Sequence, residues 1–442
     1  METMVKRDGF RSRSGFALAC IGSAVGMANI WLFPLRMGQG GGAAFLIPYV
    51  IWVVILGYSG VIEEITIGRM TRQGPVGAFS MAMKSRNLNP RLGAAGGILT
   101  VIGSLGIAIG YSVVMGWIFR YTFASITGSA YRTGDTAAYF GPIADSFGNV
   151  FWHIVALLVT FVVMTAGVSA GIERINKFMM PAFFVLFLIL AIRVAFIPGA
   201  MAGYKFMFHP DWTILAQPMT WVFAMGQAFF SLSLAGNGTV IYGSYFSSDE
   251  DIIRSARIIC IFDAIAAMLA ALVIIPACSA LLGIENLGAG PPLMFITMPK
   301  IFQHIYLGQL FMVIFFVAVL FAGLTSLVNL FEAPIATMQE VFKLSRAKAV
   351  AVIAIFSSIL ALLIEGIVGT WMDFVSIYII PVGALISAVM LYWVFGIEKA
   401  TAEMQKGHNG TVNPLIPRIG KYILCPFALV IIILGIIFKG IG

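Results

Sequence analysis

Long apolar runs, separated by short polar segments, follow one another along the whole chain. A helix that crosses the hydrocarbon of a bilayer needs about 20 mainly apolar residues, and eleven runs reach that length. We therefore predict an all-α polytopic membrane protein with eleven transmembrane helices. The predicted spans are 14–37, 43–68, 96–124, 150–170, 178–197, 213–245, 255–283, 306–341, 348–367, 371–396 and 420–440. The Gly/Pro-containing stretch 285–305 is less apolar, and we expect an external loop with a short helix there.

Lysine and arginine gather in alternate loops. Four precede the first span and five lie between the second and third spans. Cytoplasmic loops of membrane proteins carry such an excess of positive charge. The charge distribution therefore predicts a cytoplasmic N-terminal segment (1–13), and an odd number of spans then places the C-terminus outside.

Two of the spans are interrupted by small and polar residues. The first carries Gly22, Gly26 and Asn29, and the sixth carries the run SLSLAGNG at 231–238. Such residues weaken a helix and leave backbone groups that lipid cannot satisfy, although close helix packing would explain either span alone. The two spans are five apart, as in two inverted five-helix repeats, and paired interruptions of this kind mark transporter binding sites. The predicted units are a first repeat at 14–197, a second repeat at 213–396 and a last helix at 420–440.

The interruptions also indicate what could bind. The N-terminal ends of broken helices present N–H groups and positive dipole ends to an anion, while freed carbonyls coordinate a small cation. A substrate with a carboxylate, bound together with sodium, meets both requirements. A channel would instead need repeated filter or charged-ring elements, and the sequence contains none.

Composition supports a protein that lives in lipid. Hydrophobic residues make up 60% of the chain and charged residues 10%, against about 25% charged residues in soluble domains. The net charge of +8 is accounted for by the cytoplasmic loops, so we expect the lipid bilayer and no nucleic acid as a partner. The four cysteines lie in apolar segments without metal-type spacing and are expected to be buried thiols. No HExxH or GxSxG motif occurs, and we do not expect an enzyme.

Four segments resemble the neurotransmitter/sodium symporter family. They are GSAVGMANIWLFP (22–34), GIERINKFMMP (171–181), GQAFFSLSLAGNG (226–238) and AGLTSLVNLFEAP (322–334). The resemblance extends from residue 7 to about residue 424. With eleven predicted helices, the chain resembles the shorter bacterial members of the family. It implies the inverted-repeat fold of the leucine transporter, a place in the bacterial inner (plasma) membrane, and sodium-coupled import of an amino acid by alternating access.

The resemblance implies two sodium sites. The first would consist of Ala24, Asn29, Ser231 and Asp263 together with the substrate carboxylate. The second would consist of the carbonyls of Gly22, Val25 and Ala322 and the hydroxyls of Thr325 and Ser326. Oxygen-only ligands suit a hard cation, and largely neutral ligands suit a monovalent one. Hydroxyls in membrane helices also bond the carbonyl one turn back, which is the alternative role for Thr325 and Ser326.

The resemblance also implies the substrate contacts, which are Ser23, Ala24, Met27, Ala28, Ile107, Tyr111, Phe230, Ser231, Ser233, Leu234, Ala235, Ser326 and Leu330. The Tyr111 hydroxyl would bond the substrate carboxylate and, with Phe230, close the external side. Gly26 stands where monoamine carriers of the family have an aspartate, so the substrate should bring its own carboxylate. Gly110 and Gly236 stand where relatives have larger side chains, which favours a bulky hydrophobic or aromatic L-amino acid.

Gate residues follow from the same resemblance. The cytoplasmic gate would contain an Arg7–Glu340 ion pair with Phe10, Tyr245 and Glu332 nearby. Glu64 matches a glutamate that supports the break in the sixth span, and the segment from Gly171 to Pro181 would unwind and hydrate the second sodium site. At the external gate Asp373 is present, but Leu32 replaces the usual arginine. Arg36, one helical turn further out, could reach Asp373 instead.

Asp263 lies at the position where the resemblance implies a difference in the use of chloride. Animal members bind chloride near this point through a tyrosine, a glutamine and two serines. Tyr49, Gln227 and Ser231 match three of them, but Ala267 replaces the second serine and Asp263 replaces a neutral asparagine. A permanent carboxylate could stand in for chloride, which predicts chloride-independent transport with possible proton antiport. Two alternatives stay open: sodium symport of another small carboxylate-bearing amine, and a non-transporting sensor with the same fold.

Overall fold

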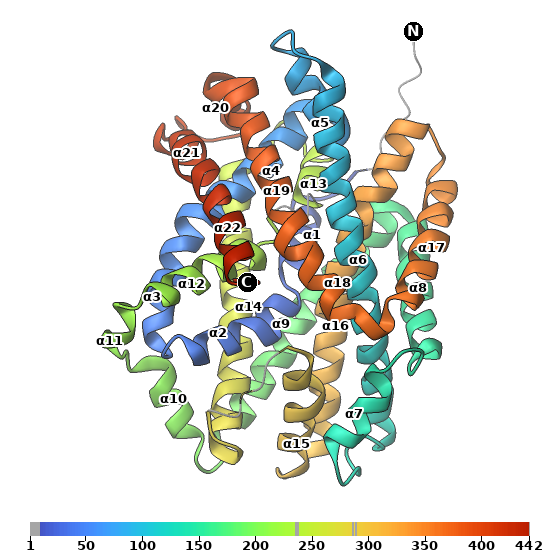
Figure 1. The fold of residues 1–442 in the computed structure, drawn as a ribbon, viewed down its shortest axis with the longest axis vertical. Coiled ribbons are helices and arrows are strands. Elements are labelled where there is room, and N and C mark those ends of the chain that lie inside the picture. The colour runs from blue at the N-terminus through green and yellow to red at the C-terminus, as the bar shows by residue number, and fades with distance from the viewer. Residues whose placement is uncertain (1–8, 235–237, 285–286, 288–289, 442) are drawn as a thin grey trace.

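The computed structural model describes residues 9–234, 238–284, 287 and 290–441, and every regular element within them is a helix. Most of the long helices run roughly along the longest axis of the molecule (Figure 1). In this part of the chain, eight helices are long and apolar enough to cross a membrane, and one bent pair would make a ninth. The two remaining predicted spans correspond to the 16-residue helix α8 (Val150–Thr165) and to the pair α12 and α13, so the total of eleven stays a prediction.

The elements of the first half of the chain are α1 (Arg13–Ala24), η1 (Ala28–Leu32), α2 (Phe33–Gln39), α3 (Ala43–Trp52), η2 (Val53–Gly57), α4 (Tyr58–Thr71), α5 (Pro75–Lys84), α6 (Pro90–Thr127), α7 (Thr136–Ala144), α8, η3 (Val168–Glu173), α9 (Arg174–Ala195), α10 (Ala200–Phe208) and α11 (Trp212–Leu215). Those of the second half are α12 (Pro218–Ser231), α13 (Gly238–Ser244), α14 (Ile252–Leu281), η5 (Leu293–Thr297), α15 (Met298–Gln303), α16 (Gly308–Phe342), α17 (Arg346–Leu363), η6 (Glu365–Ile367), α18 (Val368–Phe374), η7 (Val375–Ile379), α19 (Ile380–Val389), η8 (Met390–Gly396), α20 (Ile397–Gln405), α21 (Leu415–Ile419), η9 (Gly420–Leu424) and α22 (Cys425–Ile437). The stretch 285–305 holds a short helix, η5 followed by α15, as expected.

The fifth predicted span is longer than the sequence indicated. Helix begins at Val168 as η3 and continues through α9, whereas hydropathy placed the start at residue 178. The added turns contain Glu173, which accepts hydrogen bonds from the Arg11 N–H at 2.7 Å and the Ser12 hydroxyl at 2.8 Å and pairs with Lys177 at 2.6 Å. Because Glu173 and Lys177 form these hydrogen bonds and ion pair within the protein, the helix continues through the two charged residues.

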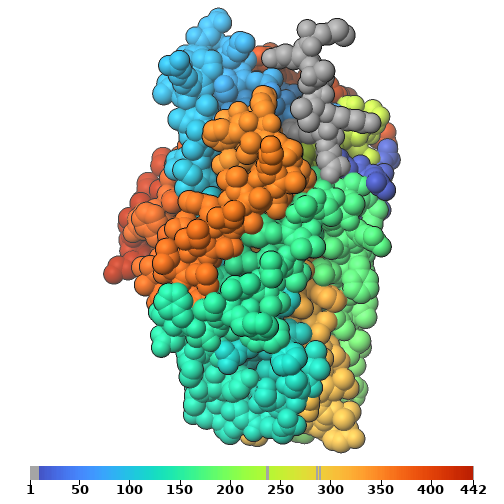
Figure 2. All heavy atoms as spheres, turned by 90° about the vertical axis from the view of Figure 1, so that its right-hand side faces the viewer, coloured from blue at the N-terminus to red at the C-terminus, as the bar shows by residue number. Residues whose placement is uncertain are grey.

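The surface formed by α8 and α17 is strongly apolar. The two helices pack against each other, and Figure 2 shows them as neighbouring bands on one face of the molecule. Phe151, Leu158, Val162, Ile355 and Leu363 on this face are each at least 61% exposed. An exposed apolar surface of this extent suits contact with lipid tails and agrees with a membrane protein.

The interrupted helices lie at the centre of the bundle. α1 packs against α9, α14 and α16, while α13 packs against α4 and α16. The long helices α6 and α16 lie along each other beside them. The two breaks are thus enclosed by unbroken helices that can supply side chains to them from several directions.

Candidate functional site

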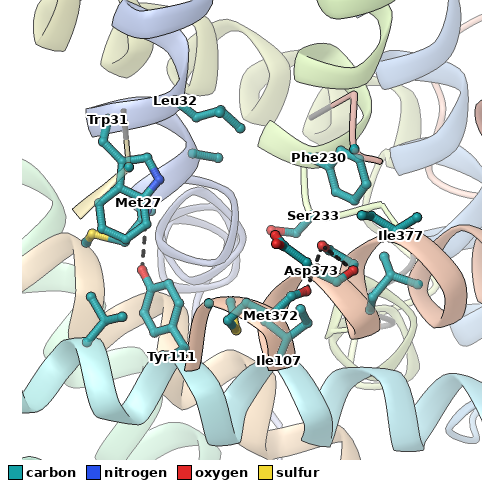
Figure 3. Close-up of a pocket in the computed structure, with 18 of the residues that line it drawn as sticks. Met27, Trp31, Leu32, Ile107, Tyr111, Phe230, Ser233, Met372, Asp373 and Ile377 are labelled. Carbon is teal, nitrogen blue, oxygen red and sulfur yellow. Dashed lines mark hydrogen bonds between the residues drawn. The ribbon is translucent and has the colours of Figure 1, made fainter. Parts of the chain in front are cut away.

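The break between α1 and η1 leaves two backbone donors inside the protein. Val25 is extended (φ −71°, ψ 107°), and the helix axes on its two sides differ by 53°. The Gly26 N–H donates to Asn29 Oδ1 at 3.0 Å, and the Met27 N–H donates to the Tyr111 hydroxyl at 3.3 Å. Side chains therefore satisfy the helix end that the sequence predicted, and the Tyr111 hydroxyl sits directly beside it (Figure 3).

The second break faces the first. α12 ends at Ser231, α13 begins at Gly238, and Ser233 between them has a left-handed φ of +53°. The Ser233 hydroxyl donates to the Ser23 carbonyl at 3.0 Å, which ties the two interrupted helices together. Residues 235–237, including the predicted contact Ala235, lie outside the described residues.

A cavity of about 480 Å³ opens beside the two breaks. Ten of the thirteen predicted substrate contacts line it: Ala24, Met27, Ala28, Ile107, Tyr111, Phe230, Ser233, Leu234, Ser326 and Leu330. Ser23 and Ser231 are buried close by, at 5% and 0% exposure. Tyr111 enters the cavity from α6 and Phe230 from α12, and Figure 3 shows the two rings apart from each other. The lining of the cavity also includes Asp373 and Lys439.

Two glycines of the site behave differently. A Cβ on Gly26 would lie 3.1 Å from Ser326 Oγ and 3.2 Å from the Tyr111 hydroxyl, so a side chain there would extend into the cavity. The space beside Gly110, in contrast, is already filled, because a Cβ there would collide with Met372 Sδ and lie 3.1 Å from the Trp371 ring. The inference that Gly110 makes room for a larger substrate is therefore wrong, and Gly236 lies outside the described residues.

Asp263 on α14 is the carboxylate of the predicted first sodium site. It is fully buried and accepts hydrogen bonds from Asn29 Nδ2 at 2.7 Å and from the Ser231 hydroxyl at 2.8 Å. No lysine or arginine of the described residues forms an ion pair with it. A buried carboxylate without a cationic partner is costly. The carboxylate of Asp263 and the Ser231 hydroxyl are hard oxygen donors that suit sodium, whereas Asn29 turns its amide nitrogen toward Asp263 and its Oδ1 toward the Gly26 N–H.

The predicted second sodium site lies between α1 and α16. The Thr325 hydroxyl donates to the carbonyls of Phe321 at 2.9 Å and Ala322 at 3.0 Å, which is the alternative role considered above. These bonds use the hydroxyl proton and leave oxygen lone pairs for a cation. Thr325 also packs on Gly22, with its Cβ 3.0 Å from where a Gly22 Cβ would be. The structure thus brings Thr325 beside Gly22, and hydroxyl and carbonyl oxygens are the type of donor that suits sodium.

The predicted cytoplasmic gate centres on Glu332 of α16. The Tyr245 hydroxyl donates to Glu332 at 2.9 Å, and Arg346 donates to both its carboxylate oxygens at 3.0 and 2.8 Å. Sequence reasoning missed Arg346, although a carboxylate inside a span needs a cation and Arg346 opens the next helix. Phe10 stacks edge-on against Tyr245, the Gly74 N–H donates to Glu340 at 3.0 Å, and Arg7 lies outside the described residues.

Breaking the Glu332–Arg346 pair should be costly. Glu332 is fully buried and Arg346 is 16% exposed, and removing one partner of a buried pair costs about 3–5 kcal/mol. We expect Glu332→Gln to lower the melting temperature of the detergent-solubilised protein strongly. Glu250→Gln, which breaks an ion pair with the 74%-exposed Arg13, should cost under about 1 kcal/mol. Equal shifts in the two variants would contradict the role given to Glu332.

The end of the cavity at the predicted external gate holds both Arg36 and Asp373. The Arg36 guanidinium lies 4.1 Å from the centre of the Phe223 ring and donates to Gln39 at 3.1 Å. No ion pair joins Arg36 to Asp373 in the described part of the chain. Lys439, after the end of α22, also lines this region, and no sequence signal connected that residue with the site.

Comparison with known proteins agrees with this geometry. The model of the sodium:neurotransmitter symporter family matches residues 7–139 and 141–440. The chain belongs to this family. Its members are sodium-coupled transporters, not enzymes, and the resemblance carried by the four sequence segments is confirmed.

Individual relatives of the symporter family cover nearly the whole chain. An uncharacterized sodium-dependent transporter of Bacillus subtilis, YhdH, is 33% identical over 90% of each chain. A sodium-dependent nutrient amino acid transporter of Drosophila grimshawi is 26% identical over 90% of this chain and 72% of its own. MhsT, whose crystal structure in complex with L-phenylalanine is known, is 33% identical in sequence to this chain. The two structures superimpose with a TM-score of 0.85, and the match covers 97% of this chain and 99% of that chain. This match confirms the leucine-transporter type of fold.

Proposed function

We propose that the protein is a symporter that imports a bulky hydrophobic or aromatic L-amino acid together with sodium. The observation that carries the proposal is the helix break, which places the Met27 N–H and the Tyr111 hydroxyl beside a cavity open to the external-gate residues. A substrate carboxylate would replace their mutual hydrogen bond, and apolar residues such as Ile107, Phe230 and Leu330 would surround the side chain. The L-phenylalanine bound to MhsT supports the same substrate class.

Two sodium ions would bind beside the substrate in this proposal. Asn29, Ser231 and Asp263, with Ala24, would hold the first ion, and the substrate carboxylate would complete its shell. Thr325 and Ser326, with the carbonyls of Gly22, Val25 and Ala322, would hold the second. Because the substrate is itself a ligand of the first ion, sodium and substrate should each raise the affinity for the other by the same factor.

Asp263 would make transport independent of chloride. The carboxylate supplies a permanent negative charge beside the first sodium ion, at the place where Ala267 lacks the hydroxyl that a chloride ion would need. After sodium leaves toward the cytoplasm, the bare carboxylate would take up a proton for the return step. The cycle would then export a proton for each imported substrate.

Alternating access would use the two sets of gate residues. On the side of α5 and α20, the Glu332–Arg346 pair and the contacts of Tyr245 and Glu340 would close the cytoplasmic path, with Arg7 as a further partner. On the opposite side, approach of Tyr111 and Phe230 would close the cavity, and Arg36 would approach Asp373. We propose a cytoplasmic N-terminus and an external C-terminus, in agreement with the distribution of positive charge.

Substrate chemistry can be tested by thermal shift on purified protein. We expect L-phenylalanine to raise the melting temperature in sodium but not in potassium, since a ligand at 100 times its dissociation constant adds about 2.7 kcal/mol. Phenethylamine, which lacks the carboxylate, should give no shift, because Gly26 supplies no charge to replace it. Equal stabilisation by phenethylamine would rule out the amino-acid assignment.

A tyrosine pair provides the matched variants for the same assay. Tyr111→Phe removes the hydroxyl proposed to bond the carboxylate and should weaken L-phenylalanine binding by about 10-fold or more, because hydrogen bonds to charged groups contribute about 1.5–3 kcal/mol. Tyr121→Phe, in the same helix, removes a buried hydroxyl that donates to the Phe295 carbonyl at 3.0 Å. This control should retain wild-type affinity.

A further inference from the structure

Asn176, on the first turn of α9, has one half of its amide without a partner. The side chain is fully buried. Its Nδ2 donates to the Ile172 carbonyl at 2.9 Å, which fixes the orientation of the amide, while Oδ1 accepts no hydrogen bond from any of the described residues. A buried acceptor left unsatisfied costs about 1–3 kcal/mol. An oxygen retained at such a cost indicates a ligand that the protein alone does not supply.

The free oxygen points at the break region of α1. A Cβ added to Gly22 would collide with Asn176 Oδ1 and would lie 3.0 Å from Thr325 Cβ. Three helices, α1, α9 and α16, therefore converge at this point. Gly22 and Thr325 both belong to the set proposed above to hold the second sodium ion.

We propose that Asn176 Oδ1 is a further ligand of the second sodium ion, an inference that rests on the proposed function. An amide oxygen is a neutral, hard donor like the carbonyls of the site. The other donors proposed for this ion come from α1 and α16, so Asn176 would add a third helix to the site. Binding of the ion would satisfy the orphaned oxygen and hold α9 against α1.

The same helix face is also attached to the N-terminal segment. Glu173 lies three residues before Asn176, on the same side of the helix, and accepts hydrogen bonds from the Arg11 N–H and the Ser12 hydroxyl. Gly15 of α1 leaves the space that the Glu173 carboxylate occupies. Release of residues 11–15 would free the start of α9, so Asn176 could leave the ion when the cytoplasmic side opens. Asn176 would thus link opening on this side to sodium release.

The test is a sodium titration of the purified protein by thermal shift, at constant ionic strength with choline as the replacement cation. Asn176→Leu keeps the size of the side chain and removes the oxygen. We expect it to raise the half-maximal sodium concentration by about 10-fold or more, as loss of groups around a bound metal typically does. Asn149→Leu is the matched control, since Asn149 is also a buried asparagine and both its amide atoms lack partners. It should leave the sodium midpoint unchanged.

A structural role would give a different result. In that case Asn176→Leu would lower the melting temperature measured without sodium but leave the half-maximal sodium concentration unchanged. If Thr325→Ala raises the half-maximal sodium concentration at the same time, the second sodium site stands but Asn176 is not one of its ligands. If the wild-type protein shows no response to sodium, the proposed function fails instead. Asn176→Asp covers the case in which the leucine variant does not fold. Its added charge should lower the sodium midpoint, and an unchanged midpoint would overturn the assignment.

Discussion

Asp263→Asn should nearly abolish sodium-dependent transport. The substitution keeps the shape of the side chain but removes the one formal negative charge that contacts Asn29 and Ser231. Because Asp263 is a proposed direct ligand of sodium, its loss should lower the affinity for sodium by more than the roughly 10–100-fold effect of changing groups that only support ligands. In proteoliposomes we expect the half-maximal sodium concentration for L-phenylalanine uptake to rise by about 100-fold or more.

A second buried carboxylate provides the control for this variant. Glu63 in α4 is 2% exposed and accepts a hydrogen bond from the Ser387 hydroxyl at 2.9 Å. Like Asp263, it is a buried carboxylate within a predicted span, but its hydrogen-bond partner Ser387 is not a proposed ligand of sodium. Glu63→Gln should keep the wild-type sodium dependence, which separates loss of a ligand from loss of any buried charge.

Chloride should rescue Asp263→Asn once a missing hydroxyl is restored. Ala267 lies one helical turn after Asp263, on the same face of α14, and is fully buried. The buried Tyr49 hydroxyl has no hydrogen-bond partner among the described residues and is available to donate to an anion, whereas Gln227 Nε2 donates to the Ala28 carbonyl at 3.1 Å. We expect Asp263→Asn with Ala267→Ser to regain uptake in chloride but not in gluconate. Wild-type uptake should be equal in both salts, and a loss in gluconate would refute the charge-replacement account.

Hydropathy predicted most of the apolar helices, but it did not predict where some of these helices begin and end. The residues Gly22, Gly26 and Asn29 predicted an interruption of the first span, and the structure has a break there, at Val25. The start of the fifth span was placed ten residues late because Glu173 and Lys177 look like loop charges in the sequence. Only the three-dimensional contacts of Glu173 with Arg11 and Ser12 show that these charges belong to a helix.

In the candidate site, too, some features could be predicted from the sequence and others could not. Residues near the breaks could be predicted to lie together because each family motif fixes a local stretch of backbone, and ten of the thirteen predicted substrate contacts line one cavity. The space beside Gly110 could not be predicted from the sequence, since the volume beside a glycine depends on which distant residues lie there, in this case Met372 and Trp371. Arg346 and Asn176 were missed for a related reason. Their importance lies in contacts with Glu332 and Gly22 on other helices.

Replacing Thr325 and Ser326 together by alanine should remove sodium-driven uptake. The two hydroxyls are proposed ligands of the second sodium ion, and Thr325 is fully buried beside Gly22. The hydroxyl of Thr325 bonds carbonyls of its own helix, and losing such a bond costs only about 1 kcal/mol. The double variant should therefore fold, yet proteoliposomes containing it should take up no L-phenylalanine above the sodium-free background.

Two hydroxyls in other helices make the matched control. Thr160 in α8 and Ser357 in α17 are fully buried and donate to the carbonyls of Ala156 at 2.8 Å and Ile353 at 2.6 Å. The double variant Thr160→Ala and Ser357→Ala loses the same chemical groups from the same kind of bond, so uptake should stay near the wild-type rate. If uptake falls equally in both double variants, the hydroxyls of Thr325 and Ser326 act only through helix stability. Wild-type uptake that proceeds equally well in potassium would show that sodium does not drive this transporter.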